Sequence, residues 1–444
     1  MRVSSTRDKG NAAIRITLVI ALTVVVTTVP SRSTEAETEL SRTPSLDQVV
    51  AYTLSHHPDF AALDAEQRGV TEIICSTSAW PDPQVMIGVT NVGATDWTVG
   101  TEPMAQIRLQ VVQSVPRPSA LRQAHIVAEH DVSLLSASIE SRRNHVAADV
   151  ARSALELYHF DRRIAIEQTI VGRYRDMYES AEARAVVGVV TNDELVSISL
   201  EKAAAEAKVA ELIDRRPAYV AELNTLMYRP ENKRLDGIVV DDLTPLPVTD
   251  ADLFVAARTN HPDLTHRRLL VARAEANWRL VDAQRIPDPA ITAVYAWRGD
   301  MDGIYSVSAG VALPLQMDRT RGARVRHAAA MVEARERNLE AAEREVAGRI
   351  DALLVRLRAN AGLVSQYEST LIPRGEQVVA ARLAGYAVGR TNLIAVLDAV
   401  RRLEQLRLDA LEAEVTHRKL TITLYEAIGS AVNLAVGTPL ESNK

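Results

Sequence analysis

A tripeptide that occurs twice sets the organisation of this chain. His-Pro-Asp stands at residues 57–59 and again at residues 261–263, about 200 residues further on. Proline fits the first turn of a helix, where its missing N–H costs nothing, and the following aspartate favours the positive end of the helix dipole. Both copies therefore predict a helix start. We expect the two histidines to belong to that start and not to a metal site.

The residues around the two copies repeat in the same order. Each copy follows a short helical stretch and precedes a helical segment that ends before Pro-Asp-Pro, at residues 81–83 and 287–289. In both halves there follow two alternating segments, a closing proline and a very long helical pattern. Because five landmarks recur in one order at one spacing, the sequence indicates a tandem duplication.

The alternating segments predict strands with one apolar face. In residues 107–115 apolar side chains alternate with polar ones, and in residues 304–313 they alternate with small ones. Such strands suit the wall of a membrane barrel and also a half-buried soluble sheet, so the alternation leaves both open. Aromatic residues beside these strands fit either a membrane interface or ordinary strand propensity. The apolar set comprises Ile107, Leu109, Val111 and Val115, with Tyr305, Val307, Ala309, Val311 and Leu313; the aromatic set comprises Trp80, Trp97, Tyr295, Trp297 and Tyr305.

Each half also predicts a long antiparallel helical hairpin. Residues 324–384 hold apolar positions at steps of three, four or seven, which is typical of a coiled-coil seam. About 60 helical residues would make a rod of roughly 90 Å. Pro373 lies inside this run and is expected to bend it. Gly188 and Gly389 stand where the two hairpins turn, and we expect them to supply the turn conformation.

The N-terminal residues have the pattern of an export signal. Basic residues precede an apolar run at residues 16–29, and residues 34–36 offer a small-residue cleavage site. A run of about 14 residues is short for a membrane span, although an uncleaved anchor is the alternative. Cys75 is the single cysteine, so no disulfide can form within the chain.

Five segments are expected from these patterns. They are a signal peptide at residues 1–36, repeat 1 at residues 37–228, a linker at residues 229–250, repeat 2 at residues 251–432 and a tail at residues 433–444.

No enzyme, cofactor or metal motif is present in the sequence. It has no Gly-x-Ser-x-Gly, no phosphate-binding loop, no dinucleotide fingerprint and no His-Glu-x-x-His. The formal net charge of −6, with both signs mixed along the chain, excludes a nucleic-acid footprint. His-Pro-Asp is also the signature of J-domain co-chaperones, but two copies behind an export signal do not fit that context. We expect a protein that is not an enzyme and holds no cofactor or metal.

The ordered landmarks resemble those of the TolC-like outer membrane factors of Gram-negative bacteria, over about residues 45–432. The stretches NHPDL and RIPDPAITAVYAW, and the turn YAVGRTNLIAVLDA at residues 386–399, carry the resemblance. Residues 81–118 resemble the first strand hairpin of members that accompany copper and other heavy-metal pumps. The implied fold is mainly α with a membrane β-barrel, in which each chain of a homotrimer gives four strands to a twelve-stranded barrel continued by an α-helical tunnel.

The resemblance implies a function as well as a fold. The protein would be the outer membrane exit duct of a tripartite efflux pump, with a long periplasmic extension. Its partners would be a periplasmic adaptor, or membrane fusion protein, and a proton-driven transporter of the inner membrane. Heavy-metal ions are favoured as cargo and drugs are the alternative. A soluble periplasmic coiled-coil adaptor or scaffold is the competing interpretation.

Two sets of site residues follow from the resemblance. The adaptor-contact tips would be Val187, Gly188, Val189, Val388, Gly389 and Arg390, and the periplasmic gate would comprise Asp193, Glu194, Thr391 and Asp398. The same glycines fit plain helix C-caps, and the same acidic residues fit a solvated surface. Thr391 replaces an arginine common in the family and Ala395 replaces an acidic residue, so Asp398 is expected to act without the usual gate network.

Overall fold

The computed structural model describes residues 40–93, 99, 102–186, 188, 190–240 and 249–431. These residues belong to one compact unit. The expected signal peptide and tail, Trp97 and the tip residues Val187 and Val189 lie outside the described residues.

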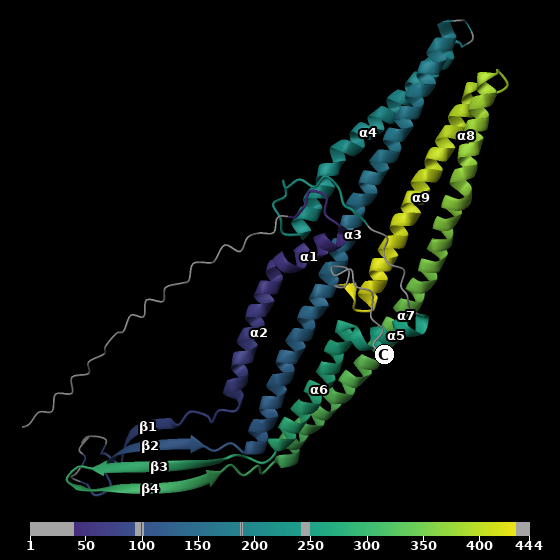
Figure 1. Cartoon of the computed structure of the whole chain (residues 1–444). Coiled ribbons are helices and arrows are strands. Elements are labelled where there is room, and N and C mark those ends of the chain that lie inside the picture. The colour runs from purple at the N-terminus through teal and green to yellow at the C-terminus, as the bar shows by residue number, and fades with distance from the viewer. Residues whose placement is uncertain are drawn as a thin grey trace, which may run out of the picture. The chain divides into compact units, whose positions relative to one another are not determined.

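Two sets of elements follow one another in the same order (Figure 1). The first comprises α1 (Leu46–His56), α2 (Pro58–Thr77), β1 (Gln84–Thr90), β2 (Gln106–Ser114), α3 (Pro118–Val186) and α4 (Asn192–Leu226). The second comprises α5 (Asp250–Asn260), α6 (Pro262–Ala283), β3 (Pro289–Arg298), β4 (Met301–Val311), η1 (Asp318–Gly322), α7 (Ala323–Gln366), η2 (Tyr367–Leu371), α8 (Ile372–Ala387) and α9 (Leu393–Ala427). The predicted strand pair and long helical hairpin in each half are confirmed.

Both His-Pro-Asp copies start a helix, as predicted. Each proline occupies the first turn of its helix, α2 or α6, and each histidine is the N-cap residue. The histidine Nδ1 accepts a hydrogen bond from the backbone N–H two residues on, at 3.3 Å from Asp59 and 3.2 Å from Asp263. Burial lowers the pKa of both histidines, which favours the unprotonated Nδ1 that can accept. The imidazole ring therefore caps the helix N-terminus, as a serine or aspartate side chain more often does.

The long helical run of the second half is interrupted near Pro373. The π-helical turn η2 separates α7 from α8, and the proline lies in the first turn of α8. Proline has no N–H for the helical ladder, and its ring crowds the carbonyl four residues earlier. A widened π-helical turn relieves that crowding. The first half carries no such interruption, because α3 is continuous over 69 residues.

The four strands form one antiparallel sheet in the order β1-β2-β3-β4. The register places Ile87 opposite Leu109, Leu109 opposite Tyr295, and Tyr295 opposite Tyr305. Because side chains alternate along each strand, the predicted apolar positions of both halves share one face of the sheet. The opposite face is mixed. It carries Arg108, Gln110, Ser306 and Ser308 together with the apolar Val112, Val294 and Ile304. Among the described residues, β1 and β4 each pair with a strand on one side only.

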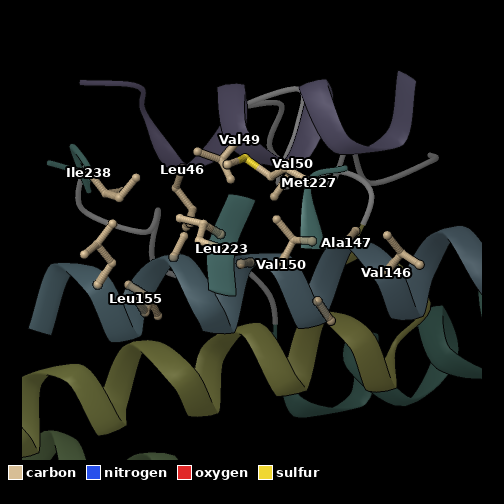
Figure 2. Close-up of a cluster of buried hydrophobic side chains, with 14 of the residues drawn as sticks. Leu46, Val49, Val50, Val146, Ala147, Val150, Leu155, Leu223, Met227 and Ile238 are labelled. Atoms are coloured by element: carbon tan, nitrogen blue, oxygen red, sulfur yellow. The ribbon is translucent and has the colours of Figure 1, made fainter. Parts of the chain in front are cut away.

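A large cluster of buried apolar side chains lies where α1 and α3 meet the end of α4. Figure 2 shows Leu46 and Val49 of α1 above Val150 of α3, with Leu223 of α4 beside them. Ile238 joins this cluster, and Ser45 and Val239 form a parallel bridge. Leu235 and Ile238 therefore anchor the expected linker in the core, so this segment does not simply connect the halves. A second cluster joins α5, α7 and α9.

No helix among the described residues is both long and apolar enough to cross a membrane.

Candidate functional site at the turns of the two hairpins

Two glycines form the turns between the paired long helices. Gly188 has φ of 76° and Gly389 has φ of 75°, a left-handed conformation that favours glycine. Their backbone N–H groups donate to the carbonyls of Ala185 at 2.9 Å and Tyr386 at 3.1 Å. A Cβ added at either glycine would meet nothing within 4 Å. The turns thus need glycine for their conformation, as predicted, and the space around them is open.

The predicted tip residues that are described lie at the surface. Val388 is 68% exposed, and Arg390 is exposed. The Arg390 backbone N–H donates to the carbonyl of Gly385 at 2.8 Å, which closes the end of α8. A large apolar side chain held at a turn in water is a feature of contact surfaces.

Glu194, predicted at the gate, has a local structural role. Its backbone N–H donates to Thr191 Oγ1 at 3.3 Å, and its carboxylate accepts from the Thr191 backbone N–H at 3.2 Å. These reciprocal bonds form a capping box at the start of α4. Asn392 caps α9 in a related way, because its side chain accepts from the Ala395 backbone N–H at 3.0 Å.

The other gate candidates have different surroundings. Thr391 is half-buried against Gly385, where any side chain at residue 385 would collide with the threonine hydroxyl. Asp193 and Asp398 are exposed, and neither side chain forms an ion pair with a described residue. The structure therefore places all four candidates near the two turns, but it does not join them into one network.

The two turns are held together by a contact that the sequence did not predict. The guanidinium of Arg184 lies 4.9 Å from the ring centroid of Tyr386, and its Nη2 lies 3.5 Å from the Tyr386 carbonyl oxygen. Burial raises the pKa of Tyr386, and the nearby charge of Glu194 raises it further. The Tyr386 hydroxyl is buried without a hydrogen-bond partner in the described chain. A slight signal for this contact is present in the sequence, because both residues lie close to a turn glycine. Arg184 precedes Gly188 by four positions, and Tyr386 precedes Gly389 by three.

A mainly apolar cavity of about 430 Å³ lies between the hairpins, next to these turns. Its walls come from α3, α4, α8 and α9, and they include Met177, Ile198, Val379, Leu383 and Tyr386. The cavity borders the apolar cluster that joins the two hairpins. The apolar cluster below the turns therefore contains an open cavity at its border.

A partly buried charged cluster lies between α3, α4 and α9. Lys208 Nζ is 2.5 Å from Glu167 Oε1 and 3.6 Å from Glu404 Oε1. The Glu167 side chain is fully buried and that of Glu404 is 16% exposed. Burial raises the pKa of Glu404 to about 7, the neighbouring Glu167 raises it too, and Lys208 opposes the change. The ammonium of Lys208 therefore interacts with both carboxylates.

Replacing Glu404 with glutamine is expected to stabilise the protein at pH 8. Because the folded protein keeps a proton that the unfolded chain releases, the stability from this group falls as pH rises from its ordinary pKa of 4.5 to about 7. Glutamine lacks the charge, so Glu404→Gln should gain about 1–2 kcal/mol at pH 8 and nothing at pH 4.5. The midpoint of thermal unfolding at the two pH values measures this. Asp398→Asn removes an exposed carboxylate of the same helix that forms no ion pair with a described residue, so it should retain the wild-type pH dependence. An equal gain at both pH values for Glu404→Gln would contradict the assignment.

Comparisons with known proteins agree with this architecture. The family model described as "Outer membrane efflux protein" matches residues 253–430. No curated protein matches the sequence. Among solved structures, VceC from Vibrio cholerae is 16% identical, with a TM-score of 0.70 over 86% of this chain and 96% of its own. CusC is 14% identical, with a TM-score of 0.72 over 86% and 92%. The open-state MtrE channel of Neisseria gonorrhoeae is 15% identical, with a TM-score of 0.70 over 88% and 90%.

These solved structures share the fold, and the family match covers most of the second set of elements. The chain therefore has the fold of these solved channels over nearly its whole length, and residues 253–430 match the family of outer membrane efflux proteins.

Proposed function

We propose that the protein is the outer membrane exit duct of a tripartite efflux system. The apolar face that runs across all four strands is the observation that supports this most directly. On this face Ile87 is 76% exposed, Tyr305 is 79% exposed and Val307 is 77% exposed. Side chains of this kind need lipid or protein to cover them. Lipid on one face and a water-filled lumen on the other would match both faces of the sheet.

The edges of the sheet support a homotrimer. Backbone groups on the outer edges of β1 and β4 have no partner strand among the described residues. Within lipid such edges are too costly to leave open, so the sheet must be completed by further strands. Three copies would supply twelve strands and close a barrel. The long helices would then continue the duct on the periplasmic side.

The glycine turns are proposed as the contact with a periplasmic adaptor. Gly188 and Gly389 leave open space at the surface, and Val388 beside them is exposed. An adaptor could therefore approach the backbone closely at these positions. The adaptor would connect the duct to a proton-driven transporter of the inner membrane. Substrate would pass through the duct without chemical change.

Heavy-metal ions are the proposed cargo, on the resemblance of the first strand hairpin at residues 81–118. A strain that lacks the gene should become sensitive to copper, silver, zinc or cobalt. The same strain tested against dyes and antibiotics provides the comparison. Unchanged metal tolerance together with lost drug tolerance would assign the duct to drugs. Unchanged tolerance to both panels would argue against an efflux function.

Asp398 is proposed to restrict ion flow at the periplasmic entrance. Its carboxylate is exposed near the second turn and has no ion-pair partner among the described residues. A ring of such charges from three copies would bind cations and hinder their passage. Asp398→Ala should raise the conductance of purified protein in planar bilayers by about twofold or more. Asp351→Ala removes an exposed charge of α7 and should leave conductance unchanged; equal conductance of both variants would remove Asp398 from this role.

A further inference from the structure

The ends of α4 and α9 are built alike. After α4 the chain turns through Tyr228, with φ of 55°, and the Arg229 backbone N–H donates to the Asn224 carbonyl at 2.9 Å. After α9 it turns through Gly429, with φ of 76°, and Ser430 donates to the corresponding carbonyl at 2.8 Å. Both ends thus show the hydrogen bond of a Schellman motif. The two halves can therefore be compared position by position.

Each turn packs against the histidine that caps the second helix of its half, α2 or α6. A side chain at Gly429 would come within 2.8 Å of His261 Cα, so the second half requires glycine there. In the first half the ring of Tyr228 meets the ring of His57 edge-on, with centroids 4.4 Å apart. A left-handed conformation is uncommon for a residue as bulky as tyrosine. The first half therefore holds a strained aromatic residue where the second half has a close-packed glycine.

Arg229 follows this tyrosine and is buried. It is 8% exposed, and its Cζ lies 5.7 Å from the ring centroid of Tyr52. Its Nη1 atom is buried without a hydrogen-bond partner in the part of the chain that the structure describes. No carboxylate of the described residues forms an ion pair with it. Because a buried, unpaired charge is unfavourable, a bound anion would stabilise this guanidinium.

A cavity of about 600 Å³ gives access to the guanidinium. Arg229 lines it together with His57, Arg142, Tyr228 and Glu231. Arg142 is half-exposed and lies 3.1 Å from Asp59, so its guanidinium is near but already paired. Of the two lining arginines, Arg229 is thus the one whose charge is not neutralised by an ion pair within the described residues.

The comparable cavity of the second half lacks this charge. It also measures about 600 Å³, and it lies against Pro262 and Gly429. Its polar lining consists of hydroxyl and amide side chains with Glu140, and Arg is not among its lining residues. The positive cavity is therefore a property of the first half and does not follow from the duplicated fold.

We propose that the cavity around Arg229 is a binding site for a phosphate or carboxylate group of a small soluble molecule. Guanidinium groups match both oxyanions, because their planar N–H groups can donate two parallel hydrogen bonds. Helix α2 has 20 residues and a length of about 30 Å, and it separates His57 from β1. If the sheet lies in lipid, as proposed above, the site is too far from it for a lipid headgroup. The occupant therefore comes from solution.

Titration calorimetry on the purified full-length protein tests this site without any export assay. The probes are inorganic phosphate and glutarate, in separate titrations at low ionic strength, since salt screens the attraction. We expect at least one probe to bind the wild-type protein and to raise its thermal midpoint. Arg229→Gln should weaken that binding at least tenfold. Arg258→Gln, which changes a 72%-exposed arginine of α5, should bind as the wild type does.

Two further variants complete the test. One keeps the test valid if Arg229→Gln fails to fold, and the other measures the effect of the carboxylate that lines the cavity. Arg142→Gln changes a half-exposed residue and should weaken binding severalfold with the fold intact. Glu231→Gln should strengthen binding severalfold, because it removes the carboxylate that lines the cavity. Absence of binding by both probes, or equal binding by wild-type protein, Arg229→Gln and Arg142→Gln, would overturn the proposal.

Discussion

Val307→Arg is expected to abolish assembly of the protein in the outer membrane. Val307 lies opposite Ala293 on the apolar face of the sheet and is 77% exposed. If that face contacts lipid, an arginine near the middle of the bilayer costs about 2–4 kcal/mol per chain, and a trimer would carry that cost three times. Heat-resistant trimers in the outer membrane fraction measure the effect. We expect them to fall below about a tenth of the wild-type amount.

Ser306→Arg is the matched control for this prediction. Ser306 is the neighbouring residue of β4, so its side chain points to the opposite face of the sheet. That face already carries Arg108, and an arginine facing water costs little. Ser306→Arg should therefore assemble as the wild type does. Equal assembly of the two variants would show that the apolar face does not contact lipid.

Gly389→Trp is expected to abolish export while trimers still form. A Cβ added at this exposed turn would meet nothing within 4 Å, so we expect an indole group there to extend into solvent and to leave the packing of the chain intact. It would occupy the surface that we assign to the adaptor. The left-handed conformation adds a local cost of about 1–2 kcal/mol for a residue other than glycine, which a protein of this size should tolerate. Export of the cargo from intact cells, together with trimer recovery, measures both effects.

Two substitutions separate bulk from backbone strain in this test. Asparagine accepts a positive φ more readily than other residues, so Gly389→Asn should export normally. Gly348→Trp adds the same indole to an exposed glycine within α7, away from the turns, and should also export. Normal export by Gly389→Trp would exclude this turn as the adaptor contact. Loss of export by Gly389→Asn would assign the defect to backbone strain.

Local patterns in the sequence predicted much of the fold. The period of two in residues 107–115 and 304–313 located β2 and β4, and proline with aspartate located the starts of α2 and α6. The two turn glycines were found for the same reason, because a left-handed turn after a long helix needs glycine. A further local signal was missed. Residues 191–194, Thr-Asn-Asp-Glu, fit a capping box, which explains Glu194 without a gate.

The surroundings of the candidate site depend on contacts between residues far apart in the sequence, and local sequence patterns do not contain these contacts. Glu426 is buried on α9, where His145 lies 2.8 Å and Arg152 lies 2.7 Å from its carboxylate, more than 270 positions away in the sequence. Burial raises the pKa of Glu426, but these hydrogen bonds outweigh burial and lower it. The contact between Arg184 and Tyr386 likewise joins the two halves. Such pairs could not be predicted, because periodicity assigns a residue to a face and does not identify its partner.

The location and assembly state of the unmodified protein test the exit-duct proposal most directly. Cells that produce the full chain are separated into soluble periplasm, inner membrane and outer membrane, and each fraction is examined for heat-resistant oligomers. The duct predicts trimers in the outer membrane fraction and little protein elsewhere. The competing interpretation, a soluble periplasmic coiled-coil adaptor, predicts recovery in the soluble periplasm. Recovery of the protein in that fraction, without outer membrane trimers, would contradict the exit-duct proposal.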